Sequence, residues 1–509
     1  MALSKSQKIA QQRKDEEEAA LLERELSNRL CQKSLSHFVR TAWHIVEPHT
    51  VYQHNWHIDD ICLHLEAVTD GRIENLVIMV PPGHMKSLIV NVFWPAWVWG
   101  TKPHKRWIFG AHSQSLSTRD SIRMRDLIRS DEYKQIFQVS WSLRDDQDQK
   151  TRYDNTATGF RLATSVGGAG TGERADFIVA DDPIKAQDAQ SELKREDVSI
   201  WWGQAMSTRD NVPGQTRRVI IMQRLHDKDL AGEYETKGYT VLRLPAEFIP
   251  SKRCSTPIGW SDPRTKEGEL LFPTRFTPEV QAKLRRDLGS FGYSAQQQQD
   301  PAPADGGIIK AQWWKLLRKF PSDIREIVQF VDCAQKPGLS NDFTVIATWA
   351  RVTNGYVVLD VWRGKTDAVI LEATVKAQAD KWRPNAIVIE DKSAGSSLIQ
   401  TLRYETDLPV IAYEPHGSKE VRAIAGVPTI EAGKVSLFVG APWSRQNVHV
   451  NSEWANTNIE DGFEHSPDAF IQEHSKFPKG ANDDYVDTTT MAIDYFRKSD
   501  GAYAGVTFL

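Results

Sequence analysis

A lysine and a serine follow an apolar run in the first half of the chain, and together they suit phosphate chemistry. The stretch VIMVPPGHMKSLIV runs from Val77 to Val90 and ends in Lys86 and Ser87 before a second apolar run. A nucleotide-binding loop needs backbone donors, a lysine that reaches the β/γ-phosphates and a hydroxyl that binds Mg²⁺. Its usual glycine pattern is not met here, because Val80 and Met85 stand where glycines are expected. An ordinary helix N-terminus is therefore the alternative.

Two adjacent carboxylates end another apolar segment, RADFIVADDPI. Here Asp181 would hold Mg²⁺ through water, and Asp182 would orient or deprotonate the attacking water. Taken alone, this pair is also what a capped turn after a strand contains. Because the lysine–serine pair and the aspartate pair occur in order within one α/β segment, we predict a site for ATP with Mg²⁺.

A second group of carboxylates lies in the last third of the chain. Asp332 and Glu390 each end an apolar segment, and Asp483 and Asp484 precede a helical one. Several carboxylates that converge can hold two metal ions ~3.5 to 4 Å apart for phosphodiester cleavage. An all-oxygen site suits Mg²⁺ or Mn²⁺. Singly, each of these acids is more often a solvated or capping residue; three further acids could surround the site, namely Asp342, Asp391 and Asp487.

The elements that must position these groups alternate between strands and helices. Compact apolar segments predict strands near residues 76–80, 106–111, 176–180, 217–222 and 239–244, with helices or loops between them. This alternation is typical of an α/β domain with a parallel sheet. Later, two alternating runs flank Asn354-Gly355, which predicts a hairpin, and a helix, a strand and a helix follow. Three antiparallel strands followed by that order predict a ribonuclease H-like fold.

These patterns divide the chain into segments. We predict a charged N-terminal helix in 1–33, a P-loop ATPase domain in 34–270, a connector in 271–321, a ribonuclease H-like nuclease domain in 322–499 and a C-terminal tail in 500–509.

Composition indicates a globular protein. The 509 residues include 40% hydrophobic and 26% charged residues, with a net charge of −4, so any nucleic-acid contact must come from local patches. The four cysteines have no spacing that indicates a disulfide framework or a zinc site. No apolar run approaches the ~20 residues of a membrane helix, so we expect no membrane partner and a location in a cytoplasm.

Four ordered motifs resemble those of the large terminase subunit of tailed bacteriophages. They are PPGHMKS, AHSQSLSTRDSIRMRDLI, VGGAGTGERADFIVADDP and VIIMQRLHDKDLAGE, within a resemblance that runs from Ser34 to Lys498. The resemblance implies an ASCE-type ATPase that drives double-stranded viral DNA into a procapsid, joined to an endonuclease that cuts concatemeric DNA. It also implies a small terminase subunit and a portal protein as partners. The chain would form a ring of five copies during packaging and could be a monomer in solution. The location would be the host cytoplasm, outside the mature virion.

The resemblance also implies roles for individual residues. The phosphate loop would be Pro82, Gly83, His84, Met85, Lys86 and Ser87, with catalytic roles for Lys86 and Asp182 and magnesium held by Ser87 and Asp181. Gln53 and Trp56 would lie near adenine, although a core or surface tryptophan is the alternative for Trp56. The nuclease triad would be Asp332, Glu390 and Asp483, with Asp484 as a neighbouring metal ligand.

Other assignments leave more than one candidate. Gln223 would couple hydrolysis to movement, with a polar strand end as the alternative. The loop 167–174 could cradle an anion or be a hairpin loop. The arginine that acts in trans on the γ-phosphate would be one of Arg119, Arg123, Arg125 and Arg174. Phosphate contacts to DNA, or simply surface solubility, are predicted for Lys283, Arg285, Arg286, Lys310, Lys315, Arg318 and Lys319.

Two other functions remain open on sequence grounds. A helicase-nuclease of DNA repair or recombination would also join a P-loop to an acidic nuclease. A catalytically inactive scaffold is the alternative that is not an enzyme, and Met85 motivates it.

Overall fold

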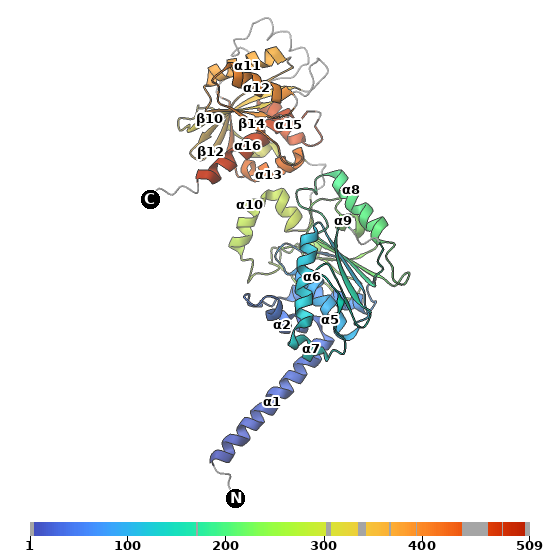
Figure 1. Ribbon diagram of the computed structural model, residues 1–509. Helices are drawn as coiled ribbons and strands as arrows, with labels where there is room; N and C mark the ends of the chain where they lie inside the picture. The colour runs from blue at the N-terminus through green and yellow to red at the C-terminus, as the bar shows by residue number, and fades with distance from the viewer. Residues whose placement is uncertain are drawn as a thin grey trace. The chain divides into compact units, whose positions relative to one another are not determined.

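The computed structural model describes residues 5–168, 172–301, 307–333, 343–365, 368–392, 394–439, 467–480 and 482–503. The chain forms two compact units, which we treat separately (Figure 1). The first consists of Met1–Gln281 and Ser294–Pro301, and the second of Ala282–Tyr293 and Ala302–Leu509. Each unit has its own sheet and hydrophobic core. No helix in the described ranges is long and apolar enough to span a membrane.

The first unit is built on an eight-stranded sheet with the order β3-β4-β5-β2-β6-β7-β1-β8. Its central strands are buried and parallel, as the continuous apolar runs predict. The strands are β1 (Asn75–Met79), β2 (Trp107–Ala111), β3 (Leu143–Asp148), β4 (Arg152–Asn155), β5 (Phe160–Ser165), β6 (Phe177–Asp181), β7 (Arg217–Met222) and β8 (Thr240–Arg243).

Strand order explains how distant motifs meet. β7 lies between β1 and β6 and pairs in parallel with both. The carboxyl ends of these three strands therefore share one sheet edge, where ligands bind in open α/β sheets. That edge receives the loop after β1 and the two aspartates at the end of β6.

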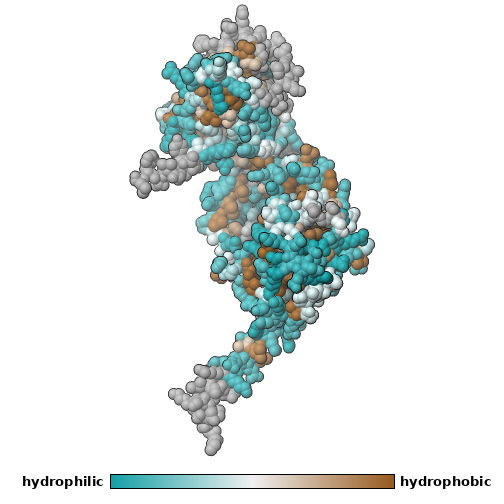
Figure 2. Space-filling model, viewed as in Figure 1, coloured by the Kyte–Doolittle hydropathy of each residue, from teal (hydrophilic) through white to brown (hydrophobic). Residues whose placement is uncertain are grey.

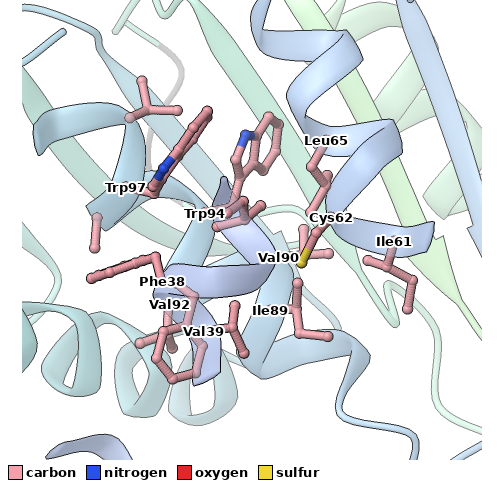
Figure 3. Close-up of a cluster of buried hydrophobic side chains, with 14 of the residues drawn as sticks. Phe38, Val39, Ile61, Cys62, Leu65, Ile89, Val90, Val92, Trp94 and Trp97 are labelled. Atoms are coloured by element: carbon pink, nitrogen blue, oxygen red, sulfur yellow. The ribbon is translucent and has the colours of Figure 1, made fainter. Parts of the chain in front are cut away.

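Helices cover this sheet. Bounds in the first unit are α1 (Lys5–Lys33), α2 (Leu35–Val46), α3 (Trp56–Thr69), α4 (Lys86–Leu88), the π-helical turn η1 (Ile89–Phe93), α5 (Trp94–Thr101), α6 (Gln114–Arg129), α7 (Asp131–Phe137), α8 (Glu192–Ile200), η2 (Trp201–Met206), α9 (Leu230–Glu235) and η3 (Pro250–Lys252). Figure 3 shows side chains of α2, α3, η1 and α5 packed together in the core.

The long helix α1 extends away from the rest of its unit (Figure 1). It is rich in charged residues and strong helix formers, which explains a helix with little burial. Figure 2 shows a hydrophobic patch partway along it. Four leucines of this helix are exposed, Leu21, Leu22, Leu26 and Leu30.

The second unit contains a seven-stranded sheet with the order β14-β13-β10-β11-β12-β15-β9. β10, β11 and β12 are antiparallel neighbours, while β13 and β14 add in parallel on the other side of β10. This order confirms the predicted ribonuclease H-like arrangement. The strands are β9 (Lys315–Leu317), β10 (Glu326–Asp332), β11 (Thr344–Val352), β12 (Gly355–Gly364), β13 (Ala386–Glu390), β14 (Val410–Tyr413) and β15 (Val435–Phe438).

The predicted hairpin joins β11 and β12, with Val352 opposite Gly355. Gly355 has a φ of 145°, and a Cβ there would lie 2.2 Å from the carbonyl oxygen of Lys434, so this turn requires glycine. Helices of this unit are η4 (Ala311–Trp313), α11 (Ala368–Trp382), α12 (Ala394–Glu405), α13 (Lys419–Glu431), α15 (Pro467–Lys476) and α16 (Asp484–Tyr503).

The predicted connector 271–321 has residues in both units. α10 (Pro278–Gln296) is broken at Gly289, whose φ/ψ is not helical, and Ala282–Tyr293 belongs to the second unit. Ser294–Pro301 then returns to the first unit, where the N–H of Ala246 donates to the carbonyl of Gln297 at 2.8 Å. The first unit extends to Gln281, beyond the boundary expected at 270.

Candidate functional site

The loop after β1 has the backbone of a phosphate-binding loop without its usual glycines. Gly83 and Met85 have φ values of 77° and 63°, both in the left-handed region. At Gly83 a Cβ would lie 2.9 Å from the ring of Phe276, so the side chain is excluded sterically as well. At Met85 the same backbone form is kept by a residue that adopts it at a cost. Methionine therefore replaces glycine at residue 85 while the left-handed turn of the loop is kept.

Lys86 and Ser87 begin the helix after this loop, and each faces one of the two aspartates. The Lys86 Nζ lies 3.2 Å from Asp182 Oδ2, and Lys86 is only 6% exposed. Ser87 donates its hydroxyl to Asp181 Oδ1 at 3.1 Å. The fold thus brings together two pairs of residues that are far apart in the sequence, the lysine and serine after β1 and the two aspartates at the end of β6.

Electrostatics of this edge favour a cation. Burial raises the pKa of Asp181 to about 7, and the nearby carboxylates of Asp182 and Asp120 contribute to this rise. Carboxylates crowded in this way become more stable when a positive ion lies between them. The oxygen and hydroxyl donors of Asp181 and Ser87 suit Mg²⁺.

Asp182 is held by backbone contacts as well as by Lys86. Its φ of 41° places it in the left-handed region, and its Oδ1 accepts the backbone N–H of Gln223 at 3.1 Å. Gln223 thus meets Asp182 through its main chain. The Gln223 Oε1 is buried and lacks a hydrogen-bond partner within the described ranges.

Gln53 and Trp56, which were predicted to lie near adenine, do not stack on the phosphate-binding loop. Gln53 is exposed, and Trp56 packs edge-on against His57 with the Arg264 guanidinium 5.4 Å from its ring. The ring that stacks on the loop is Phe276, 4.5 Å from that of His84 with an interplanar angle of 7°. Phe276 lies beyond the boundary predicted for this domain. The aromatic residues of FPTRF were the available signal.

The four arginine candidates have separate surroundings. Arg119 and Arg123 face Asp120 and Glu47, Arg125 pairs with Asp148, and Arg174 is exposed. These contacts do not single out one arginine as the group that acts in trans. Residues 169–171 of the glycine-rich loop lie outside the described ranges.

The second constellation converges at the carboxyl ends of two parallel strands. Asp332 ends β10 and Glu390 ends β13, which pair in parallel. They line a cavity of about 370 Å³ together with Asp484 and Asp487 from the start of α16 and with Asp483, the residue before this helix. The sequence prediction of one shared site is thus met in space.

Asp487, which the sequence placed only around the site, lines this cavity together with the other acids. Burial raises the pKa of Asp332 well above its usual range, and among its neighbours the carboxylate of Asp487 contributes most, ahead of Glu390 and Asp484. Asp484 instead binds the buried guanidinium of Arg363. The spacing of Asp483 and Asp487 by one helical turn was the signal that could have identified this pair.

Basic groups share the cavity with the acids. Lys419 Nζ lies 2.8 Å from Asp483 Oδ1 and 2.6 Å from Asp487 Oδ2, and Arg422 contacts Asp487 at 2.7 Å. Lys392 lies 2.8 Å from Glu390. No three metal-binding side chains of the described ranges already lie close enough to form a closed metal site. The cluster of carboxylate oxygens nevertheless has the donor chemistry that Mg²⁺ or Mn²⁺ requires.

The remaining acids are placed as follows. Asp391 accepts a hydrogen bond from the Ser396 hydroxyl at 2.5 Å and does not line the cavity. Asp342 lies outside the described residues. All seven predicted DNA-contacting residues are exposed and belong to the second unit, namely Lys283, Arg285, Arg286, Lys310, Lys315, Arg318 and Lys319.

Comparisons with known proteins agree with the fold of the second unit. Its strand order defines a ribonuclease H-like domain. Residues 329–496 match the family model described as the terminase RNaseH-like domain. The second unit therefore contains a terminase-type ribonuclease H-like domain, and the matched segment includes Asp332, Glu390 and Asp483.

Solved structures similar to the chain include several phage proteins. The large terminase of a thermophilic bacteriophage has 10% identity and a TM-score of 0.46, with 84% of this chain and 97% of that chain covered. The large terminase of bacteriophage HK97 has 10% identity and a TM-score of 0.35, with coverage of 80% and 90%. The large terminase nuclease of the thermophilic phage G20c has 13% identity and a TM-score of 0.25, with coverage of 38% and 98%. No curated protein matches.

Proposed function

We propose that this chain is the large subunit of a tailed-phage terminase. It hydrolyses ATP to move double-stranded viral DNA into a procapsid, and it cuts concatemeric DNA with a metal-dependent endonuclease. The observation that carries the proposal is the match to a terminase ribonuclease H-like domain whose residues include the acidic cavity. The nucleotide-type loop and paired aspartates of the first unit supply the second activity.

In the ATPase site, this chain supplies charge and position. Lys86 would bind β- and γ-phosphate oxygens, and the left-handed residues Gly83 and Met85 support a loop whose backbone N–H groups bind an anion. Asp182, released from Lys86 when the lysine binds phosphate, orients the attacking water. Ser87 and Asp181 would hold Mg²⁺, which would neutralise charge on the phosphates when bound.

In the nuclease cavity, the acids hold the cations and the bases meet the substrate. Asp332, Glu390 and Asp483 would ligate the metal, and Asp487 would join them because it lines the same cavity. Held by these acids, Mg²⁺ or Mn²⁺ would supply the activation of water and the stabilisation of the leaving oxygen. Lys392, Lys419 and Arg422 line the same cavity and can pair with DNA phosphate.

The finer assignments follow from the same proposal. The seven exposed basic residues of the second unit contact DNA backbone, and one of the four arginines acts on a neighbouring copy in a ring of five. A small terminase subunit selects viral DNA, and a portal protein in the procapsid receives it. The chain works in the host cytoplasm and is absent from the mature virion. The helicase-nuclease alternative is not favoured by any feature of the described ranges.

The experiment measures DNA cutting and ATP hydrolysis on the same samples of the full chain. Plasmid DNA is incubated with Mg²⁺ or Mn²⁺ beside Asp332→Asn, Lys86→Ala and a control, Asp360→Asn, whose carboxylate pairs with Lys381 and does not line the cavity. We expect Asp332→Asn to abolish cutting and keep hydrolysis, and Lys86→Ala to abolish hydrolysis and keep cutting. Cutting that survives in Asp332→Asn, or that is absent from the wild type with both metals, contradicts the nuclease assignment.

A further inference from the structure

Asn91 is a buried polar residue within an apolar stretch of the first unit. It interrupts the run Ile89 to Trp94 and is only 3% exposed. Figure 3 shows its neighbours Ile89, Val90, Val92 and Trp94 among the hydrophobic side chains of the core. A buried amide without hydrogen bonds is energetically unfavourable. Its partners therefore indicate why an asparagine stands there.

The backbone around Asn91 departs from a regular α-helix. η1 is a π-helical turn, and the N–H of Trp94 donates to the carbonyl of Ile89, five residues earlier. The Asn91 carbonyl accepts a hydrogen bond from Arg161 Nη1 at 2.6 Å. Arg161 is fully buried on β5, with its guanidinium 3.8 Å from the Phe109 ring. Such turns occur frequently at functional sites, and here a buried arginine contacts one directly.

The side chain of Asn91 joins two buried carboxylates. Its Nδ2 donates to Asp181 Oδ2 at 2.6 Å and to Asp120 Oδ2 at 3.2 Å. The other oxygen of Asp181 accepts from Ser87, one helical turn before Asn91. Both oxygens of Asp181 are thus held from the same face of the helix that follows the phosphate loop, which fixes the carboxylate's orientation.

Asp120 extends this network to α6. It is only 1% exposed, and Arg119 Nε lies 2.8 Å from its Oδ1. The side chain of Arg119 remains about half exposed, at 49%. A continuous path of hydrogen bonds and charge therefore joins Asp181, Asn91, Asp120 and Arg119.

We propose that Asn91 is a positioning residue of the ATPase, which holds Asp181 for Mg²⁺-nucleotide and ties its orientation to Arg119 of α6. The inference rests on the proposed ATPase function. An asparagine suits this place because it donates to two carboxylates and adds no charge, whereas an aspartate would add a third acid and donate nothing. Arg119 is then the arginine of α6 that responds to occupancy of the nucleotide site.

The test compares ATP affinity with Mg²⁺ and with EDTA, using a fluorescent ATP analogue and the full chain. The variants are Asn91→Asp, which reverses the hydrogen-bonding role, and Asn91→Ala, which removes it without adding charge. The matched control is Asn211→Asp, because Asn211 donates to Asp176 at 3.3 Å next to the opposite end of β6. Thermal unfolding establishes that each variant is folded.

The Mg²⁺ enhancement is the ratio of the affinity for the ATP analogue with Mg²⁺ to that with EDTA. We expect this ratio to fall at least tenfold in both Asn91 variants, while the affinity measured with EDTA stays within twofold of the wild type. The control should keep the enhancement. Arg119→Ala should reduce the enhancement less in the Asn91→Ala background than in the wild type, because the path is already broken. Wild-type enhancement in the folded Asn91 variants overturns the inference, as does an equal effect of Arg119→Ala in both backgrounds. A wild type that binds no ATP under either condition contradicts the proposed ATPase instead.

Discussion

Met85 shows that a phosphate-binding loop can keep its backbone conformation without the glycine that usually identifies it. Its φ of 63° is the conformation that glycine adopts freely, and its side chain is 9% exposed within the core. From sequence, the lysine, serine and paired aspartates could be predicted because their chemistry is specific. The backbone at Met85 could not, because the local sequence does not show that a methionine here adopts the left-handed region within the core.

This conformation predicts an unusual order of stability at residue 85. Met85→Ala removes the buried side chain and keeps the backbone cost, whereas Met85→Gly removes the side chain and relieves the backbone. We expect the glycine variant to be more stable than the alanine variant by about 1 kcal/mol, the opposite of the order in a helix. Urea unfolding of both variants measures this difference, and equal stability would show that the turn is not strained.

Buried histidines near the loop predict sensitivity to acid. Burial is the main reason that the pKa of His57 falls to about 3 and that of His84 to about 4, from an ordinary value of 6.5. Unfolded chains then bind protons that the folded protein does not, so stability is present above pH 6.5 and is lost as pH falls from 6.5 toward 4. Each such histidine contributes a slope of up to about 1.4 kcal/mol per pH unit.

The test follows urea midpoints of the wild type and His84→Asn at pH 7, 6 and 5. The wild type should lose more stability than the variant over this range, because one titrating group has been removed. Parallel pH profiles for the two proteins would exclude His84 as a contributor. His112→Asn is the comparison, since His112 is less buried and also contacts backbone.

At the scale of elements, a single arginine joins β12 to both helices at the nuclease cavity. Arg363 lies at 3% exposure, pairs with Glu473 of α15 at 2.7 Å and also binds Asp484 of α16. Its guanidinium lies 4.5 Å from the Tyr485 ring. One buried cation therefore compensates two buried acids, and Asp484 is oriented by it.

Removal of this cation should destabilise the second unit strongly. Arg363→Met removes the buried cation that pairs with Glu473 and Asp484, which predicts a loss of roughly 3 to 5 kcal/mol. Arg363→Lys keeps the charge and should lose less, and Lys381→Met, at a more exposed pair with Asp360, should lose under about 1 kcal/mol. Chemical denaturation measures all three. A loss of the same size for Lys381→Met would show that burial does not set the cost.

The elements also show where sequence patterns suffice. Five strands of the first unit, β1, β2, β6, β7 and β8, were predicted from continuous apolar runs, and the hairpin from Asn354-Gly355, because burial and turn chemistry are local signals. β5, which also pairs in parallel with β2, was not predicted. β3 was not predicted, since its sequence LRDDQD is polar and mostly exposed. Its conformation depends on pairing with β4, which is a partner that the sequence of β3 does not reveal. The sequence alone likewise did not show that Asp487 lines one cavity with Asp332, because that placement depends on the fold.

At the scale of the whole molecule, each unit has its own core and its own candidate site. The core clusters of one sheet and of the other share no residues. Ligands that bind one folded unit stabilise that unit by RT ln(1 + [L]/Kd), about 2.7 kcal/mol at one hundred times Kd. We expect ATP with EDTA to stabilise only the first unit, and Mn²⁺ without nucleotide to stabilise the second.

Hydrogen exchange read by mass spectrometry can measure this selectivity in the full chain. Peptides of β1 and β6 should gain protection with ATP, and peptides of β10 and β13 with Mn²⁺. Asp332→Asn should remove the second response and keep the first. Protection that spreads equally over both units with either ligand would contradict two independent sites.

The path of the chain through α10 has a consequence for inheritance. Because Ala282–Tyr293 belongs to the second unit and Ser294–Pro301 to the first, the chain passes from one unit to the other three times. No single break in the gene can separate the two units cleanly, since any crossover leaves a segment of one attached to the other. A recombination event that exchanges one unit between related genomes therefore has to keep residues 282–293 compatible with the second unit and residues 294–301 compatible with the first. The two halves of this protein are constrained to evolve together, even though each carries its own chemistry.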